Sequence, residues 1–289
     1  MDISREKMSY DLLIVGAGPS GLAAAIQFKK LCKLNNKDFS VCIVEKGSEV
    51  GAHILSGAIL QTTALDELFD DWRESNECPV KVKVNKETFK FLSNEKAFNI
   101  PSILMPSVMH NRGNYVISLG SLCRWLGNEA EKLGIEIYPG FSASDLIFEN
   151  EKLKGIITGD LGVDSEGKPG ANFQPGIEIH SKYTFFAEGC RGHLGKRLIE
   201  KFGLRNNSQH QTYGIGLKEL WEIKPENAQA GNIMHTIGWP LDFETYGGSF
   251  LYHLDKNLVS LGFVIGLDYK NPYLSPYEEF QRFKTHKAI

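Results

Sequence analysis

One segment near the start of the chain constrains its fold more than any other. Residues 10–15 (YDLLIV) are apolar and rich in strand formers, and residues 22–34 have the composition and periodicity of a helix. A glycine-rich turn, residues 16–21 (GAGPSG), lies between them, and residues 39–44 form a second expected strand that ends at Glu45. This order predicts a βαβ unit with a parallel sheet, the core of a dinucleotide-binding Rossmann-like fold.

Each glycine of this G-x-G-x-x-G pattern suits contact with a pyrophosphate. Gly16 permits the tight turn, Gly18 lets the backbone approach the phosphates, and Gly21 lets the helix pack against the sheet. The helix N-terminus adds unpaired N–H groups and a partial positive charge. Glu45 follows Gly21 by 24 residues, and its carboxylate can accept both ribose hydroxyls while it repels a 2′-phosphate. The pattern predicts a dinucleotide site that disfavours NADP; the alternative is a glycine turn beside a surface acid.

A second glycine turn follows another apolar strand. Residues 183–186 lead into residues 187–189 (AEG), after which residues 191–202 have a helical composition. Gly189 allows close approach, and the helix offers another N-terminus to a phosphate or ribityl group. Two such turns suit FAD, which is a long cofactor; an ordinary helix-entry turn has the same pattern. Residues 51–57 are a third glycine-bracketed stretch, which suits a passage towards a flavin ring or a plain loop.

Composition excludes several other classes of protein. Of the 289 residues, 42% are apolar and 23% charged, which is ordinary for a globular protein and rules out disorder and collagen-like repeats. The formal charge of −3 argues against a nucleic-acid partner, which usually requires a basic field. The five cysteines contain no C-x-x-C pair, so we expect no disulfide scaffold, no metal site and a small buried apolar role for each. No apolar run reaches the length of about 18 residues typical of a transmembrane helix.

The chain changes character after residue 210. Further helices are expected at residues 62–69, 119–133 and 275–287. Further strands are expected at residues 81–92, 135–138, 145–148, 153–158, 177–186, 212–223, 232–239, 250–254 and 258–267. Residues 160–176 are polar and rich in turn formers, so we expect a surface loop there. The predicted fold class is α/β, α+β overall: an FAD/NAD(P)-binding Rossmann-like domain with an inserted antiparallel-sheet domain.

Several longer strings resemble one family of flavoenzymes. They include VGAGPSGLAAA, EKGSEVGAHILSGA, GNYVISLGSLCRWL, FAEGCRGHLGKRL and GWPLDFETYGGSFLYHL, and such strings recur over nearly the whole chain. They resemble electron transfer flavoprotein–ubiquinone oxidoreductase. The resemblance implies an oxidoreductase with FAD and one 4Fe-4S cluster, which passes electrons from reduced electron transfer flavoprotein to ubiquinone. It also implies a monotopic protein that lies on a membrane surface without spanning it.

The resemblance implies roles for individual residues. The adenosine and pyrophosphate contacts fall on Gly16, Gly18, Gly21 and Glu45. The stretch that approaches the flavin falls on Ser56 and Gly57, and the second FAD segment on Glu188 and Gly189. The ubiquinone contacts fall on Gly247 and Gly248, whose backbone N–H groups can reach a quinone carbonyl with no side chain in the way. Without the resemblance, this Gly-Gly pair indicates a hairpin or a bulge.

One apolar, proline-broken segment, residues 100–109 (IPSILMPSVM), lacks charged side chains. Its composition suits a buried loop or a surface segment that dips into a membrane. The resemblance favours the membrane-dipping segment, through which the quinone tail enters. The expected domains are then an incomplete FAD-binding domain at residues 1–210, which includes this segment, and a truncated ubiquinone-binding domain at residues 211–289.

The chain departs from the family at its C-terminal end. It stops at Ile289, whereas members of the resembled family continue for about as many residues again. We therefore expect the cysteine-rich cluster domain and the closing FAD segment to be absent from these residues. The five cysteines lack iron–sulfur spacing, and we expect no cluster on this chain. We expect an N-terminal fragment or a truncated product, with a second polypeptide as a source of the rest. The expected location is the cytoplasmic face of a bacterial inner membrane, or the matrix side of the mitochondrial inner membrane.

No side chain is expected to act as a catalytic acid or base, because a flavin carries the chemistry in such enzymes. Four histidines near the motifs are expected to be structural or at the surface: His53, His193, His235 and His253. Two other functions fit the same sequence. One is another FAD-dependent enzyme of this architecture, such as a prenyl-chain reductase or an aromatic hydroxylase. The other is an inactive remnant or a subunit that serves only as a scaffold.

Overall fold

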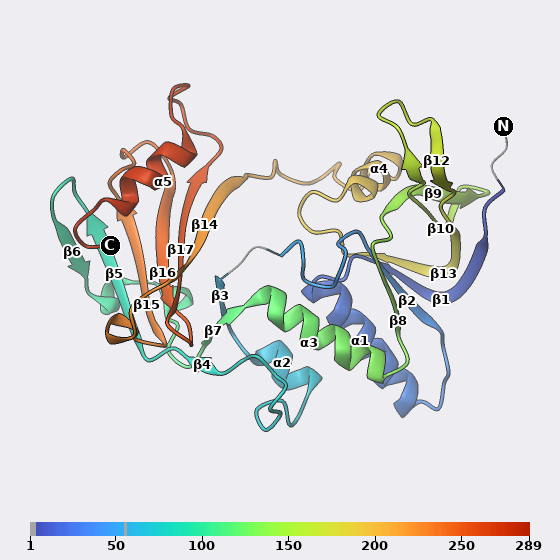
Figure 1. Ribbon diagram of the computed structural model, residues 1–289, viewed down its shortest axis with the longest axis horizontal. Coiled ribbons are helices and arrows are strands. Elements are labelled where there is room, and N and C mark those ends of the chain that lie inside the picture. Colours follow the sequence, from blue (N-terminus) through green and yellow to red (C-terminus); the bar gives the residue numbers. More distant parts are fainter. Residues whose placement is uncertain (1–3, 55–56) are drawn as a thin grey trace. The chain divides into compact units, whose positions relative to one another are not determined.

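The computed structural model describes residues 4–54 and 57–289, which divide into two compact units (Figure 1). The first unit comprises Met1–Ile54 and Gly120–Ser208, and the second comprises Leu55–Leu119 and Gln209–Ile289. The division differs from the expected boundary between residues 210 and 211. Residues 55–119 belong with the C-terminal unit, because a strand of this segment pairs with a strand of residues 232–238.

The first unit is built on a six-stranded sheet in the order β8-β2-β1-β13-β10-β9. Its strands are β1 (Lys7–Val15), β2 (Val41–Glu45), β8 (Glu136–Pro139), β9 (Ala143–Glu149), β10 (Lys152–Thr158) and β13 (Glu178–Phe186). The first four strands in this order are parallel, whereas β10 is antiparallel to both of its neighbours. The parallel half carries the βαβ unit that the glycine pattern predicts.

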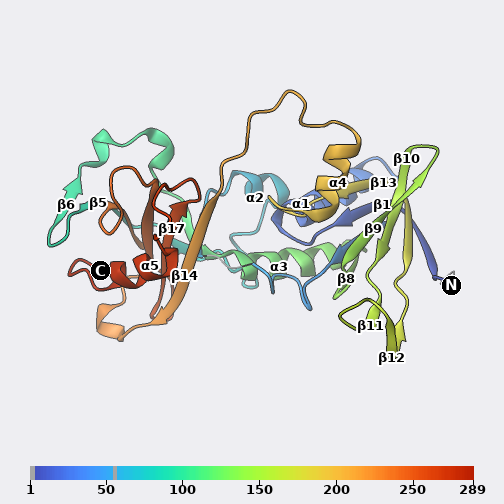
Figure 2. The ribbon, with the colours of Figure 1, turned by 90° about the horizontal axis from the view of Figure 1, so that it is seen from above.

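Helices cover both faces of this sheet. They are α1 (Pro19–Leu34), α3 (Leu119–Lys132) and α4 (His193–Lys201). Figures 1 and 2 show α1 and α3 on one side of the sheet and α4 on the other. Because β1 is covered on both faces, the adjacent Leu13 and Ile14 are both completely buried. This burial on both faces explains why β1 carries a continuous run of apolar residues and does not alternate between apolar and polar ones.

Residues 160–176 are not a plain loop. They form an antiparallel hairpin of β11 (Leu161–Val163) and β12 (Pro169–Gln174). The Asp164 carboxylate accepts hydrogen bonds from the backbone N–H groups of Glu166 and Lys168, each at 2.9 Å, and these bonds close the turn. The expected loop is wrong because both strands are almost wholly exposed, so they lack the apolar alternation by which a strand is recognised.

The second unit contains a six-stranded sheet in the order β14-β17-β16-β15-β5-β6. Its strands are β5 (Lys86–Leu92), β6 (Ala97–Ile100), β14 (Gly214–Glu222), β15 (Asn232–Gly238), β16 (Gly247–His253) and β17 (Leu258–Gly266). Neighbouring strands are antiparallel except β15 and β5, which are parallel. The antiparallel sheet expected after residue 210 is thus extended by two strands from much earlier in the chain.

The two faces of this sheet pack against different elements. On one face, α5 (Pro276–Lys284) buries Phe283 against Phe263 of β17. Full burial of one such ring stabilises the fold by about 1.5–3 kcal/mol. On the other face, Tyr252 forms a core with Val116, which belongs to a small three-stranded sheet. The unit also contains the strands of that small sheet and one α-helix: β3 (Gly57–Leu60), β4 (Val82–Lys83), β7 (Tyr115–Ser118) and α2 (Thr63–Leu68).

Candidate functional site

The glycine-rich turn between β1 and α1 packs against the end of β13. Gly16 has a φ of +107°, a conformation that favours glycine, and a Cβ there would lie 2.5 Å from the carbonyl oxygen of Ala187. A Cβ on Gly21 would lie 2.1 Å from the carbonyl oxygen of Gly16. Both residues must therefore be glycine for the turn, α1 and β13 to meet.

Gly18 differs from the other two glycines, because a Cβ there would meet no atom within 4 Å. It is the N-cap residue of α1, and no side chain caps the helix. The first turn of α1 carries no acidic residue and includes Pro19, which has no N–H to satisfy. The positive end of the helix thus borders an open space, which is the arrangement that an anionic phosphate requires.

Glu45 ends β2 beside this turn. One oxygen of its carboxylate accepts a hydrogen bond from the N–H of Ala17 at 2.9 Å, and the other accepts one from the N–H of Gly47 at 2.7 Å. The bond to Ala17 ties the carboxylate directly to the glycine-rich turn. Because each carboxylate oxygen can accept a further hydrogen bond, Glu45 can also bind a ribose diol.

The second glycine turn, after β13, differs in part from expectation. Gly189 has a φ of +77°, and a Cβ there would meet nothing within 4 Å, so the backbone is open to a close approach. The Glu188 carboxylate accepts hydrogen bonds from the N–H groups of Leu194 at 3.3 Å and Gly195 at 2.7 Å. The expectation that the N-terminus of α4 offers these groups to a phosphate is therefore wrong, because Glu188 caps the helix. A direct contact of Glu188 with FAD stays a prediction.

The third glycine-bracketed stretch spans the junction of the two units. Ser56 lies outside the described residues. Gly57 begins β3, where a Cβ would lie 2.3 Å from the Oγ atom of Ser260. Gly51 has a φ of +88°, and a Cβ there would lie 2.5 Å from the carbonyl oxygen of Gly120. Both glycines have a packing role of their own, and the approach of this stretch to a flavin stays a prediction.

Gly247 and Gly248 lie in the regular strand β16, so the alternative of a hairpin or a bulge is wrong. They pair with β17 in unbroken register, whereas the ladder between β16 and β15 ends at Ser249. A Cβ on Gly247 would lie 2.5 Å from the carbonyl oxygen of Val264. A Cβ on Gly248 would lie 2.7 Å from the carbonyl oxygen of Thr236. Neither position has room for a side chain, so this pair can contact a ligand only through its backbone.

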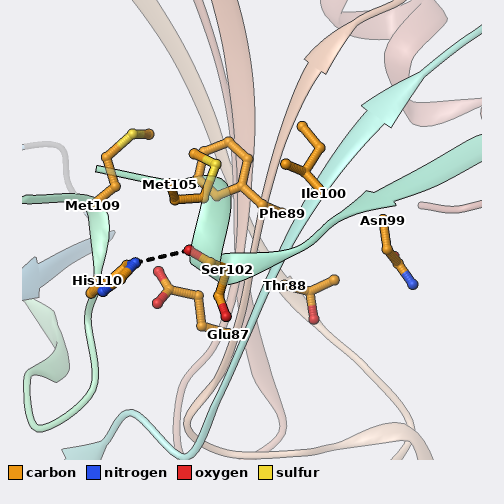
Figure 3. Close-up of a pocket in the computed structure, with 9 residues that line it drawn as sticks. All are labelled: Glu87, Thr88, Phe89, Asn99, Ile100, Ser102, Met105, Met109 and His110. Atoms are coloured by element: carbon orange, nitrogen blue, oxygen red, sulfur yellow. Dashed lines mark hydrogen bonds between the residues drawn. The ribbon is translucent and has the colours of Figure 1, made fainter. Parts of the chain in front are cut away.

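The second unit also contains a cavity of about 250 Å³ that the sequence does not mark (Figure 3). It is lined by residues of β5, β6 and the apolar segment that follows them: Glu87, Thr88, Phe89, Asn99, Ile100, Ser102, Met105, Met109 and His110. In Figure 3 the sulfur atoms of Met105 and Met109 lie on one side of the cavity and the carboxylate of Glu87 on the other. The sequence holds one signal that could have drawn attention to Glu87. Glu87 precedes Phe89 by two residues in a strand, so a carboxylate lies on the same face of the sheet as an aromatic ring.

The same carboxylate faces a histidine of the neighbouring strand β15. The Nδ1 atom of His235 lies 4.0 Å from Glu87, and its Nε2 atom lies 2.8 Å from the hydroxyl of Tyr252. The His235 ring stacks on Phe89 with 5.2 Å between the ring centroids. Burial lowers the pKa of His235, which Glu87 opposes only in part, and burial raises the pKa of Tyr252. His235 is therefore neutral at pH 7 and has the structural contacts expected of it.

The lowered pKa of His235 predicts a loss of stability in mild acid. Unfolding exposes the ring and returns its pKa to about 6.5, so below that pH the unfolded chain binds a proton that the folded chain does not. We expect the melting temperature to fall by a few degrees between pH 7 and pH 5.5, and the His235→Asn variant to show a shallower fall. Calorimetry at several pH values measures both slopes. His210→Asn, at an exposed position, is the matched control, and equal slopes for wild type and His235→Asn would contradict the prediction.

Residues 100–109 lie on the surface, so the buried-loop alternative is wrong. They include two short 3-10 helices, Ser102–Leu104 and Ser107–Met109, each of which follows a proline. Three large side chains have high relative exposure: Ile103 at 88%, Leu104 at 72% and Val108 at 90%. Such a cluster is typical of a surface that binds a membrane or another apolar partner. No described helix is long and apolar enough to cross a membrane.

The cysteines have the expected environment at four of five positions. The four buried ones are Cys32, Cys42, Cys78 and Cys123. The expected burial is wrong for Cys190, which is exposed because it follows Gly189 in the open turn after β13. Within residues 4–54 and 57–289, no group of three His, Cys, Asp or Glu side chains gathers in a way that could hold a metal ion.

Two known protein families match parts of the chain. The family described as an NAD(P)-binding Rossmann-like domain matches residues 14–70. The family described as ETF-QO, ubiquinone-binding, matches residues 213–289. The first match confirms the Rossmann-like fold class that the glycine pattern predicts. The second covers the chain from just before β14 to its last residue.

Curated relatives match nearly the whole chain. The electron transfer flavoprotein-ubiquinone oxidoreductase of Pseudomonas aeruginosa is 53% identical over 290 residues, which cover 99% of this chain and 52% of that protein. The mitochondrial protein of the same name from Homo sapiens is 51% identical over 293 residues, which cover 100% of this chain and 47% of that protein. The chain thus spans about half the length of the curated relatives it matches.

Solved structures share the fold at low sequence identity. A geranylgeranyl bacteriochlorophyll reductase-like protein from Thermoplasma acidophilum has a TM-score of 0.68, covering 96% of this chain and 62% of that chain. Its sequence identity is 17%. At this identity the likeness establishes a common fold, and it does not carry the neighbour's function to this chain.

Proposed function

Because the chain belongs to the electron transfer flavoprotein–ubiquinone oxidoreductase family, we propose that it takes part in passing electrons from reduced electron transfer flavoprotein, through FAD, to ubiquinone. One observation carries the proposal most directly. The uncapped N-terminus of α1 borders an open space at Gly18, and the carboxylate of Glu45, the proposed ribose contact, is tied to the same turn. A dinucleotide fits this arrangement through its pyrophosphate and its ribose.

The residues that would hold FAD belong mainly to the first unit. The proposed pyrophosphate and ribose contacts are Gly16, Gly18, Gly21 and Glu45. The open backbone at Gly189 would contact a part of FAD beyond the pyrophosphate. Glu188 would hold the turn that contains Gly189 in place by capping α4. The proposed contacts near the flavin ring are Ser56 and Gly57. A bound flavin supplies the capacity to accept and release electrons singly or in pairs, which connects a one-electron donor to a two-electron acceptor.

We assign the ubiquinone head to Gly247 and Gly248. The match of residues 213–289 to a ubiquinone-binding family supports this assignment. Both residues lie beyond Ser249, where the ladder between β16 and β15 ends, which supports a contact made by their backbone N–H and C=O groups on that side. A quinone carbonyl needs a donor, and a backbone N–H provides one at a fixed position. We therefore propose Gln209–Ile289, together with Leu55–Leu119, as the quinone-side domain and the first unit as the FAD-binding domain.

The exposed apolar segment, residues 100–109, is the proposed membrane contact. Its side chains at Ile103, Leu104 and Val108 are large, apolar and exposed, which supports insertion into the interfacial region of a bilayer. Ubiquinone is itself carried in membranes, so a quinone-side domain benefits from such a contact. We propose the cytoplasmic face of a bacterial inner membrane as the surface, and the matrix side of the mitochondrial inner membrane as the alternative.

We assign no iron–sulfur cluster to these 289 residues. A 4Fe-4S cluster needs four cysteine thiolates, which usually lie at short spacings along the chain. The five cysteines here are scattered, at positions 32, 42, 78, 123 and 190. The cluster that the family resemblance implies would require ligands other than these.

Flavin binding and electron transfer together test the proposal. The purified protein should quench FAD fluorescence on titration, and the loaded protein should be reduced by reduced electron transfer flavoprotein and reoxidised by a soluble ubiquinone analogue. Glu45→Gln should weaken FAD binding by about tenfold, because an amide cannot accept hydrogen bonds on both sides as the carboxylate does. Glu131→Gln, at an exposed position on α3, is the matched control. Failure to bind FAD would refute the proposal, and rapid reduction by NADPH would favour another FAD-dependent reductase.

A further inference from the structure

The apolar segment, residues 100–109, is fastened at both ends to one strand. At its start, Ile100 is the last residue of β6 and pairs with Phe89 of β5. At its end, Asn111 donates two hydrogen bonds to the carboxylate of Glu87, one from its backbone N–H at 3.0 Å and one from its side-chain amide. Glu87 and Phe89 are both residues of β5, so this strand sets the position of the whole segment.

Hydrogen bonds between the segment and the two residues that follow it hold its shape. The Nε2 atom of His110 lies 3.1 Å from the carbonyl oxygen of Ser102, a bond that closes the segment on itself (Figure 3). The Asn111 amide also donates to the carbonyl oxygen of Met109 at 3.0 Å. Both 3-10 turns begin after a proline, whose fixed φ lowers the conformational entropy of the chain before it folds. The segment is thus ordered before it meets any partner.

Packing beneath the segment is incomplete, because the cavity of about 250 Å³ lies there. Met105, Met109 and Phe89 lie together on one side of this cavity, and the carboxylate of Glu87 lies on the other. The pocket is open to solvent, so the side chains that line it lack the dispersion contacts that a filled core supplies. The side chains that point outward, such as Val108, are exposed and add no contact with the sheet. The position of the segment therefore depends on the bonds at its ends.

We propose that Glu87 is the positioning residue of the apolar segment: it holds Ile103, Leu104 and Val108 together in the arrangement that meets the membrane. This inference rests on the proposed membrane contact of the segment. A carboxylate is suited to the role, because its two oxygens accept both N–H groups of Asn111 at once. A glutamine in place of Glu87 would put its NH₂ group, which is a donor, opposite one of the two N–H donors of Asn111, and one hydrogen bond would be lost. A segment ordered in advance loses less conformational freedom on binding and so binds more tightly.

The Glu87→Gln and Asn111→Ala variants test the inference in the purified protein by hydrogen exchange. The amides to follow are those bonded within the segment, at Leu104, Met105, Met109 and His110. Loss of one charge-assisted hydrogen bond should speed their exchange by about tenfold in Glu87→Gln. Asn111→Ala should speed it by at least as much, because this change also removes the bond to the Met109 carbonyl oxygen. Binding to vesicles of phosphatidylcholine and cardiolipin should weaken, while the exchange of β16 stays unchanged. Glu95→Gln, at an exposed position in the turn between β5 and β6, removes the same charge and should change neither measurement.

The two proposals fail in different ways. Unchanged exchange of the four amides in Glu87→Gln would overturn the positioning role, whatever the vesicles show. A wild-type protein that does not sediment with vesicles would refute the membrane contact instead. Faster exchange that spreads from the segment to β16 would also overturn the inference, because Glu87 would then stabilise the whole sheet rather than the segment.

Discussion

Alanine in place of Gly21 is expected to unfold the glycine-rich turn and abolish dinucleotide binding. The new Cβ would lie 2.1 Å from the carbonyl oxygen of Gly16 and 3.1 Å from the Cγ2 atom of Ile14. The nearer of these atoms is backbone and cannot rotate away, so α1 must move off the sheet. Overpacking of this kind costs about 1–3 kcal/mol and occasionally more, and we expect a loss of about 3 kcal/mol in the free energy of unfolding. Chemical denaturation followed by circular dichroism measures the loss.

Gly18→Ala is the matched variant, because it adds the same methyl group three residues earlier in the same turn but without a clash. No atom lies within 4 Å of the added Cβ, and the backbone φ of −77° suits any residue. The change at the N-cap should cost at most about 1 kcal/mol of stability. The methyl group nevertheless enters the space proposed for the pyrophosphate. FAD affinity should therefore fall by about 100-fold, because a dinucleotide-binding turn of this kind depends on close approach of its backbone to the phosphates. A Gly21→Ala protein as stable as wild type, or a Gly18→Ala protein that binds FAD normally, would contradict this account.

The double variant Ile103→Asp, Val108→Asp is expected to release the protein from membranes. Both side chains are almost fully exposed, so their replacement costs the folded state little. Burial of one such side chain in an apolar phase is worth about 1.5–3 kcal/mol, so removal of two should reduce vesicle binding by about 100-fold or more. Sedimentation with liposomes measures the bound fraction, and thermal unfolding verifies that the fold is intact.

The control for this variant lies in the other unit. Leu34, at the end of α1, is also a large exposed apolar residue, and Leu34→Asp should leave the bound fraction unchanged. Met105 is a poorer choice for substitution than Ile103, because its side chain lines the cavity and a charge there would disturb the segment itself. Equal sedimentation of the double variant and the wild type would remove residues 100–109 from the proposed membrane contact.

Local pattern was enough to predict the βαβ unit and its glycine turn. The strand, the turn, α1 and the second strand follow one another within about 35 residues, and each is marked by periodicity or by glycine. The helices α1, α3, α4 and α5 also begin and end within a few residues of their expected bounds. The candidate ribose acid was equally visible, because the end of a strand next to a glycine turn is a position that the sequence itself defines.

Long-range pairing could not be predicted in the same way. The alternation of residues 86–92 identifies a strand, but nothing in it names β15 as the parallel partner, and this pairing moves residues 55–119 into the second unit. The sequence did not predict two further contacts for the same reason: the capping of α4 by Glu188, and the packing of Gly57 against Ser260. Each depends on which atoms meet in space after the chain has folded.

The glycine pattern, the strand and helix periods and the exclusion of other protein classes are thus written in the residues themselves, because they depend on backbone conformation and on spacing along the chain. The openness of the space at Gly18, the cavity behind Glu87 and the exposure of Ile103 and Val108 depend on the folded arrangement. A residue's surroundings are set by neighbours that are distant in the sequence. Only those surroundings separate a glycine that a ligand can approach from a glycine that another strand already covers.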